Sequence, residues 1–245
     1  MVNAGSAINV SAGTVVTKMK KIAAAAFEVS EDDLELVDGT VRVTGDQGPS
    51  LTFGEMAQMA SGMPGYVLPG GQEPGLFATH YFSPPQAAYA NGSHAVEVEV
   101  DPETGIVRIA RYIVVHDCGR MVNPLLVEGQ IQGGLAHGIG NAFLEKMRYD
   151  DDANPVTTTL ADYLLPDADN VPTAEIYHVE SPAPHNPLGV KGAGEGGTIP
   201  AAAAVVSAVE DALRPFGVQI DEAPILPERI CELIDAARQD TQEAS

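Results

Sequence analysis

The glycine-rich segment 123–146 limits the folds open to this chain more than any other part of the sequence. Asn123 is a favourable N-cap, Pro124 suits the first helical position, and apolar residues then recur at helical steps. The apolar repeat consists of Leu125, Leu126, Ile131, Leu135, Ile139 and Phe143. The pattern predicts a helix, although the segment also contains Gly129, Gly133, Gly134, Gly138 and Gly140.

These glycines oppose the predicted helix, because each costs roughly 1 kcal/mol relative to alanine in a helix interior. Something must offset that cost. Either another backbone packs against the glycine face, or a large ligand approaches the helix closely, and both explanations remain open. Gln130 stands beside Gly129 and is the natural side chain to reach such a ligand.

Residues 94–100 alternate between apolar and acidic side chains, a period of two that is typical of a strand. Residues 101–105 supply a turn, and residues 106–119 then return as a second strand that ends near Asp117. An antiparallel pair is the economical arrangement. The two faces of the first strand carry Val96, Val98 and Val100 on one side, and Glu97 and Glu99 on the other.

The N-terminal part has the pattern of a small α+β module. A helix is expected over residues 12–27, where apolar residues recur at three- and four-residue steps. A hairpin is expected around residues 38–39, followed by a capping box of Thr52 and Glu55 that opens a helix to about Ser61.

Further along the chain, residues 157–166 predict a short amphipathic segment and residues 173–184 a strand. A helix with Thr198 as its N-cap should extend to Leu213, and a final helix should cover about residues 225–238. The fold class is therefore α+β. The expected organisation is a small α+β module at 1–61, a glycine- and proline-rich crossover at 62–93, and a larger α+β lobe at 94–245.

The formal net charge of −21 argues against nucleic acid or an anionic membrane as a partner. Cys118 and Cys231 lie far apart, and neither belongs to a spacing that holds zinc or an iron–sulfur cluster. The chain lacks both a signal-peptide pattern at its start and an apolar run long enough to span a membrane. We therefore expect a cytoplasmic protein.

The stretch NPLGVKGAGEGGTIP, residues 186–200, places one carboxylate, Glu195, among glycines. Because it precedes the predicted helix, free backbone N–H groups nearby favour an anion. Gly192 and Gly194 allow a ligand to approach closely, and Lys191 adds a cation. On these residues alone, a turn whose glutamate caps the helix and a ligand-facing carboxylate both remain possible. The spacings of the common nucleotide-binding loops are absent.

Two long motifs together resemble a known family. They are DCGRMVNPLLVEGQIQGGLAHGIGNAFLE, residues 117–145, and GVKGAGEGGTIPAAAAVVSAVEDAL, residues 189–213. Both resemble the C-terminal part of the molybdopterin-binding large subunit of the xanthine oxidase family of molybdenum hydroxylases, with the carbon-monoxide-dehydrogenase-like branch closest. The likeness extends from about Val2 to Ile234. It implies the α+β fold of the C-terminal portion of the molybdopterin-binding domain of the xanthine oxidase and aldehyde oxidoreductase fold, with mixed sheets and packed helices.

The resemblance implies an oxidoreductase. Members of the family hydroxylate a carbon of an aldehyde or an N-heterocycle, or oxidise carbon monoxide, with water as the oxygen source at a molybdenum held by molybdopterin. The glutamate of the family's KGxGE motif falls on Glu195, which is therefore the expected general base beside molybdenum. No residue of this chain is expected to ligate the metal directly.

The resemblance also implies a cofactor site. The family's Gly-Gln pair falls on Gly129 and Gln130, and its glutamine binds the pterin. Backbone amides of Gly192, Ala193 and Gly194 are expected further contacts, and the 117–119 loop is a candidate for a dinucleotide extension. The cofactor would be molybdopterin cytosine dinucleotide. Three further groups are expected to pack without a direct role: His116, His137 and Cys118.

The family's upstream site elements have no counterpart in this sequence. The chain is therefore consistent with a shortened piece of a longer subunit or with a natural split subunit, which is favoured and would be inactive alone. Its partners would be a larger chain carrying the N-terminal part of the molybdenum subunit, an iron–sulfur subunit, an FAD subunit and a small-molecule substrate. A non-catalytic assembly subunit, in which Glu195 only caps a helix, is the alternative. A free-standing small-molecule-binding domain or an unrelated hydrolase is a further alternative. The sequence contains no GxSxG motif that would support a hydrolase.

Overall fold

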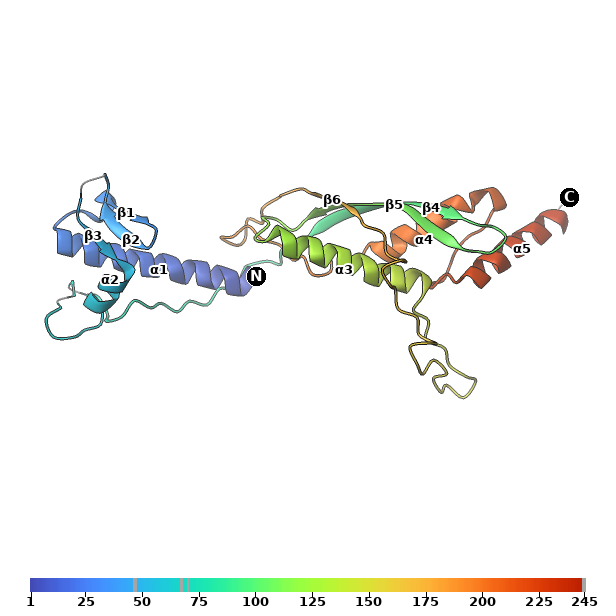
Figure 1. Cartoon of the computed structure of the whole chain (residues 1–245), viewed down its shortest axis with the longest axis horizontal. Coiled ribbons are helices and arrows are strands. Elements are labelled where there is room, and N and C mark those ends of the chain that lie inside the picture. The colour runs from blue at the N-terminus through green and yellow to red at the C-terminus, as the bar shows by residue number, and fades with distance from the viewer. Residues whose placement is uncertain (46–47, 67, 70, 244–245) are drawn as a thin grey trace. The chain divides into compact units, whose positions relative to one another are not determined.

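The computed structural model describes residues 1–45, 48–66, 68–69 and 71–243, and the chain forms two compact units. Unit 1 comprises residues 1–86 and 186–188, and unit 2 comprises residues 87–185 and 189–245. Each unit combines helices with a sheet, as Figure 1 shows. The predicted α+β class is therefore confirmed.

Unit 1 packs two helices against a three-stranded antiparallel sheet of order β1-β2-β3. Asp38 and Gly39 have φ of 48° and 75°, which forms the predicted two-residue hairpin turn. Thr52 and Glu55 form the predicted capping box. The elements are α1 (Val2–Phe27), η1 (Glu31–Asp33), β1 (Leu34–Val37), β2 (Thr40–Val43), β3 (Ser50–Thr52) and α2 (Phe53–Met59).

Helix α1 begins at Val2, well before residue 12, so the predicted start was wrong. The additional turns include Gly5, Ser6 and Asn9, whose helix propensity is low and which carry little apolar periodicity. Ser6 is nevertheless fully buried. The helix therefore extends beyond the part that its apolar periodicity predicts, although most of residues 2–11 are exposed or only partly buried.

Unit 2 contains the second sheet, of order β4-β5-β6, with α3 and α4 against one face (Figure 1). Strands β4 and β5 are antiparallel, as predicted. The core between sheet and helices includes Tyr112, Val114, Leu135, Ile139 and Val205. The elements are β4 (Asn91–Val100), β5 (Val107–Asp117), α3 (Pro124–Phe143), β6 (Glu175–His178), α4 (Ala201–Ala212), η2 (Arg214–Phe216) and α5 (Pro227–Glu243).

Strand β6 lies within the predicted strand segment 173–184 and pairs with β5 in parallel, with His116 opposite His178. Residues 157–166, in contrast, form only turns and irregular backbone, so the predicted amphipathic segment has no helix or strand of its own. Since β5 and β6 run the same way, the chain must cross back between them, and α3 lies in that connection. The parallel pairing brings the end of β5 close to the segment that follows β6.

Helix α4 begins at Ala201, and its N-cap is Pro200 with no side-chain cap bond. Thr198 is therefore not the N-cap, and the prediction was wrong at this point. The Thr198 backbone N–H donates to the Glu195 carbonyl at 3.0 Å, so Thr198 lies within a turn that precedes the helix. Thr198 also packs against Gly134 of α3, which accounts for its position.

Candidate functional site

The segment after β6 reaches the end of β5 through a short backbone bridge. Gly119 pairs with Val190, and the Lys191 N–H donates to the Cys118 carbonyl at 2.7 Å. Residues 191–197 then form a loop, which we call the Glu195 loop, between this bridge and the turn that precedes α4. One end of the Glu195 loop is therefore fixed to the sheet.

An ion pair reinforces that end. Lys191 Nζ lies 2.7 Å from Asp117 Oδ2, and only 9% of the Lys191 side chain and 12% of the Asp117 side chain are exposed. Asp117 also accepts backbone hydrogen bonds from Gly119 and Ser181, at 2.8 and 3.2 Å. Burial on its own raises the pKa of the Asp117 carboxyl, but these hydrogen bonds and the lysine charge together lower the pKa below its ordinary value.

Helix α3 holds the other end of the Glu195 loop through backbone contacts. A Cβ added at Gly197 would lie 2.8 Å from the Ile131 Cα, and one added at Gly134 would lie 2.8 Å from the Thr198 N. Neither position has room for a side chain. Of the two explanations for the helical glycines, close packing of another backbone is therefore the correct one at Gly134, and Gly138 packs in the same way against Ala201.

Two other glycines of α3 have no close neighbour at all. Gly129 and Gly133 are exposed, and a Cβ added at either would meet nothing within 4 Å. They leave an open strip on α3. Gln130 is exposed beside that strip, and a Cβ added at Gly194 would lie 3.7 Å from its amide Nε2. The structure thus brings Gln130 next to the Glu195 loop.

Glu195 lies at a groove between its own loop and residues 88–92. The groove has a volume of about 610 Å³ and is also lined by Gly192, Ala193 and Gly194. The backbone carbonyl of Glu195 accepts hydrogen bonds from the N–H groups of Thr198 and Ile199, at 3.0 and 3.1 Å. Its carboxylate is exposed and forms no hydrogen bond or ion pair with any residue that the structure describes.

This geometry bears on the helix-cap interpretation. The N–H groups before α4 are satisfied by the Glu195 carbonyl and not by its carboxylate, and α4 has no side-chain cap. The carboxylate is therefore available to the groove, as a ligand-facing or reacting group would be.

A row of histidines lies beneath the Glu195 loop. His94 of β4, His116 of β5 and His178 of β6 occupy neighbouring strands, and His116 is only 1% exposed. Burial lowers the pKa of His94 and of His116, so both favour the neutral form. The row is not a metal centre, since the described part of the chain holds no group of three His, Cys, Asp or Glu side chains placed to bind a metal ion.

Two of the residues that were expected to pack without a direct role differ in exposure. His137 is exposed on α3, whereas Cys118 is buried and burial raises the pKa of its thiol. Sequence reasoning missed the pairing of Lys191 with Asp117 and the contact of His116 with the loop. The available signals were that the first motif begins with Asp117, at the end of a predicted strand, and that the second motif contains a single cation, Lys191.

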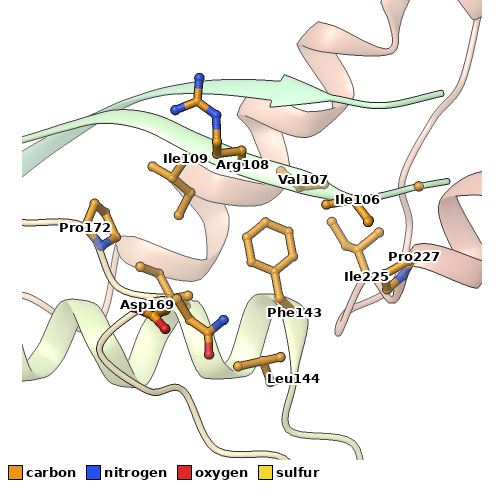
Figure 2. Close-up of a pocket in the computed structure, with 13 residues that line it drawn as sticks. Ile106, Val107, Arg108, Ile109, Phe143, Leu144, Asp169, Pro172, Ile225 and Pro227 are labelled. Atoms are coloured by element: carbon orange, nitrogen blue, oxygen red, sulfur yellow. The ribbon is translucent and has the colours of Figure 1, made fainter. Parts of the chain in front are cut away.

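A second cavity lies at the opposite end of β5 (Figure 2). Its volume is about 290 Å³, and its walls are largely apolar. Figure 2 shows Phe143 of α3 between Ile109 of β5 and Ile225. Arg108 is at the rim but is paired with Glu99 at 2.5 Å. The cavity shares no lining residue with the groove at Glu195.

No helix in the described ranges is long and apolar enough to cross a membrane.

A family model described as a molybdopterin cofactor-binding domain matches residues 1–172. The nicotine 6-hydroxylase large subunit of Paenarthrobacter nicotinovorans is 41% identical over 227 residues, which cover 93% of this chain and 28% of that protein. The carbon monoxide dehydrogenase large chain of Hydrogenophaga pseudoflava is 38% identical over 88% of this chain and 26% of its own length. The chain thus spans little more than a quarter of these relatives.

Solved structures agree with these sequence matches. Quinoline 2-oxidoreductase from Pseudomonas putida 86 superposes with a TM-score of 0.83 at 42% identity and covers 91% of this chain and 28% of its own. A Cu,Mo-CO dehydrogenase superposes with a TM-score of 0.86 at 31% identity, over 96% of this chain and 29% of its own. The fold expected from the two motifs is therefore confirmed.

Proposed function

Because this chain belongs to the molybdopterin cofactor-binding domain family, we propose that it supplies one part of the active site of a molybdenum hydroxylase. Its relatives include enzymes named for nicotine, carbon monoxide and quinoline. The reaction proposed for the assembled enzyme is oxidation of an aldehyde, an N-heterocycle or carbon monoxide, with water as the source of oxygen. Glu195 is the proposed general base.

The observation that carries this proposal is the unpartnered carboxylate of Glu195 at the mouth of a groove. A general base must be able to accept a proton, and a carboxylate held in an ion pair would do so poorly. The loop around Glu195 is fixed at both ends, by Lys191 and by Gly197. The backbone that carries Glu195 is thus held at both ends while the carboxylate oxygens remain free.

The residues around Glu195 fit the pterin cofactor. The open strip at Gly129 leaves space for a large planar group, and Gln130 can donate and accept hydrogen bonds at its edge. Backbone groups of Gly192, Ala193 and Gly194 line the groove and can bind it as well. When bound, the molybdenum cofactor would supply the redox chemistry and activate water. This chain would orient the cofactor and receive the proton.

The cofactor is proposed to be molybdopterin cytosine dinucleotide. The chain spans 28% of its nicotine-hydroxylating relative. The proposed complex includes a larger chain that carries the N-terminal part of the molybdenum subunit and completes the site. An iron–sulfur subunit and an FAD subunit would carry the electrons away. This chain would be inactive alone, as a split subunit in the cytoplasm.

The deciding experiment replaces Glu195 with glutamine in the complex purified from its host. Glu195→Gln keeps size and polarity but removes the base, so turnover should fall by about 10²-fold or more while molybdenum per complex is unchanged. Glu97→Gln, at an exposed position on β4, is the matched control and should turn over normally. Normal turnover of Glu195→Gln at full molybdenum occupancy would instead favour the non-catalytic assembly subunit.

A further inference from the structure

Gly196, the residue after Glu195, rests on the ring of His116. A Cβ added at Gly196 would overlap Nε2 of His116 and would lie 2.7 Å from its Cδ2. No other loop glycine meets a side chain so closely, since a Cβ added at Gly192 meets nothing within 4 Å. The loop backbone therefore lies directly on this imidazole.

Packing, and not hydrogen bonding, holds the His116 ring. Neither of its ring nitrogens has a hydrogen-bond partner among the described residues, although the side chain is 1% exposed. His94 flanks the ring from β4 and His178 from β6, and Asp117 follows it on β5. Glu128 Oε1 of α3 lies 3.8 Å from His178 Nε2. Because the His116 ring has no hydrogen-bond partner among the described residues, it contacts the loop through packing alone.

The contact between Gly196 and His116 matters because it lies next to Glu195 in the loop. The Glu195 loop is clamped at Lys191 and at Gly197, and only Gly196 separates Glu195 from the second clamp. If the support beneath Gly196 is removed, the backbone can drop toward the sheet and the preceding carboxylate moves with it. A shift of about 1 Å at a reacting group can cost about 100-fold in rate.

We propose that His116 is a positioning residue whose ring supports Gly196 from beneath and thereby sets the position of the Glu195 carboxylate. The kinetic part of this inference rests on the proposed function of Glu195, whereas the structural part does not. The two parts are tested separately.

The structural test measures amide hydrogen exchange of residues 192–197 in the full chain. His116→Ala removes the support and should speed exchange of these amides at least 10-fold, whereas His116→Gln places an amide nitrogen near the lost Nε2 and should stay within 3-fold of wild type, both as order-of-magnitude expectations. Exchange of the α3 amides serves as the internal control for overall folding.

Glycine variants test the same contact from the loop side. Gly196→Ala should overlap the ring and speed exchange of the loop, while Gly192→Ala, the matched control, should not. Combining Gly196→Ala with His116→Ala should remove the overlap, so the double variant should exchange more slowly than the Gly196→Ala single variant. Wild-type exchange in both His116→Ala and Gly196→Ala would overturn the proposal. If His116→Ala does not fold, Gly196→Ala and its control Gly192→Ala decide, and wild-type loop exchange in Gly196→Ala would then overturn the proposal.

The kinetic test uses the loaded complex. His116→Ala should lower kcat by about 10- to 100-fold with molybdenum content and KM near wild type, and His116→Gln should restore most of kcat. Unchanged kcat in His116→Ala, measured beside a Glu195→Gln variant that is inactive, would overturn the positioning role alone. Unchanged kcat in both variants would overturn the proposed function, while the exchange data would still decide whether His116 supports the loop.

Discussion

Lys191 Nζ lies 2.7 Å from Asp117 Oδ2, and this nearly buried ion pair joins residues that are 74 positions apart in the sequence. The pair fixes the start of the Glu195 loop to the end of β5. Two backbone N–H groups complete the coordination of Asp117, so the carboxylate is fully satisfied only in the folded structure.

Removing the lysine charge should therefore be costly. Lys191→Met keeps the length of the side chain but leaves the Asp117 carboxylate uncompensated, and such a loss typically costs about 3–5 kcal/mol. Arg108→Met is the matched control, because Arg108 and its partner Glu99 are both 65% exposed and such pairs contribute about 0–1 kcal/mol. Urea unfolding measures both values. Equal losses in the two variants would contradict the structural role of the buried pair.

Adjacent glycines of α3 should respond to alanine with opposite signs. Gly133→Ala adds a methyl group where nothing lies within 4 Å, so the chain should gain roughly 1 kcal/mol of helix propensity. Gly134→Ala places the same group 2.8 Å from the Thr198 N, and overpacking of this kind costs about 1–3 kcal/mol. Thermal unfolding of the two variants side by side measures the difference, and two shifts of the same sign would refute it.

Two glutamines of α3 should separate cofactor binding from folding. Gln130→Ala should lower cofactor retention in the complex with little change in stability, since the side chain is exposed. Gln132→Ala should lower stability by about 1–2 kcal/mol, because it loses one bond to the Pro172 carbonyl and one from the Ala174 N–H. Pterin and molybdenum content, measured beside urea unfolding, tests both. Full occupancy in Gln130→Ala would remove its proposed role.

Stability should fall as the solution is acidified below about pH 6.5. Burial lowers the pKa of His94 and of His116 from the ordinary value of 6.5. The unfolded chain therefore binds protons first as the pH falls, and the folded state loses free energy relative to it until the pH reaches the lowered pKa values. Urea unfolding between pH 7.5 and pH 5.5 measures this slope. His116→Gln should make it shallower, and a flat wild-type profile would show that burial does not perturb these rings.

Local patterns allowed much of the fold to be predicted. The alternation of Val96, Val98 and Val100 identified β4, and the Asn123–Pro124 start identified α3, because period and capping are properties of short stretches. The start of α1 was missed because residues 2–11 include residues of low helix propensity, such as Gly5 and Ser6, and show little apolar periodicity, so no local pattern marks them as helical.

The candidate site was predictable only in part. Glu195 and Gln130 stood out through the two motifs, and the structure places Gln130 beside the Glu195 loop. The partners of the loop could not be predicted in the same way. Asp117 is a strand end, His116 is one residue of an apolar strand, and their contacts with Lys191 and Gly196 arise from the parallel pairing of β5 and β6.

The parallel pairing of β5 with β6 also has a consequence for the order in which the chain folds. The strands can meet only after the intervening residues 118–174, including all of α3, have been brought together, and closing so long a loop is slow and entropically costly. Asp117 cannot reach Lys191 before that step. We therefore expect the position of the Glu195 loop to be established late in folding, and we expect local unfolding of β6 to release the loop while α3 remains intact.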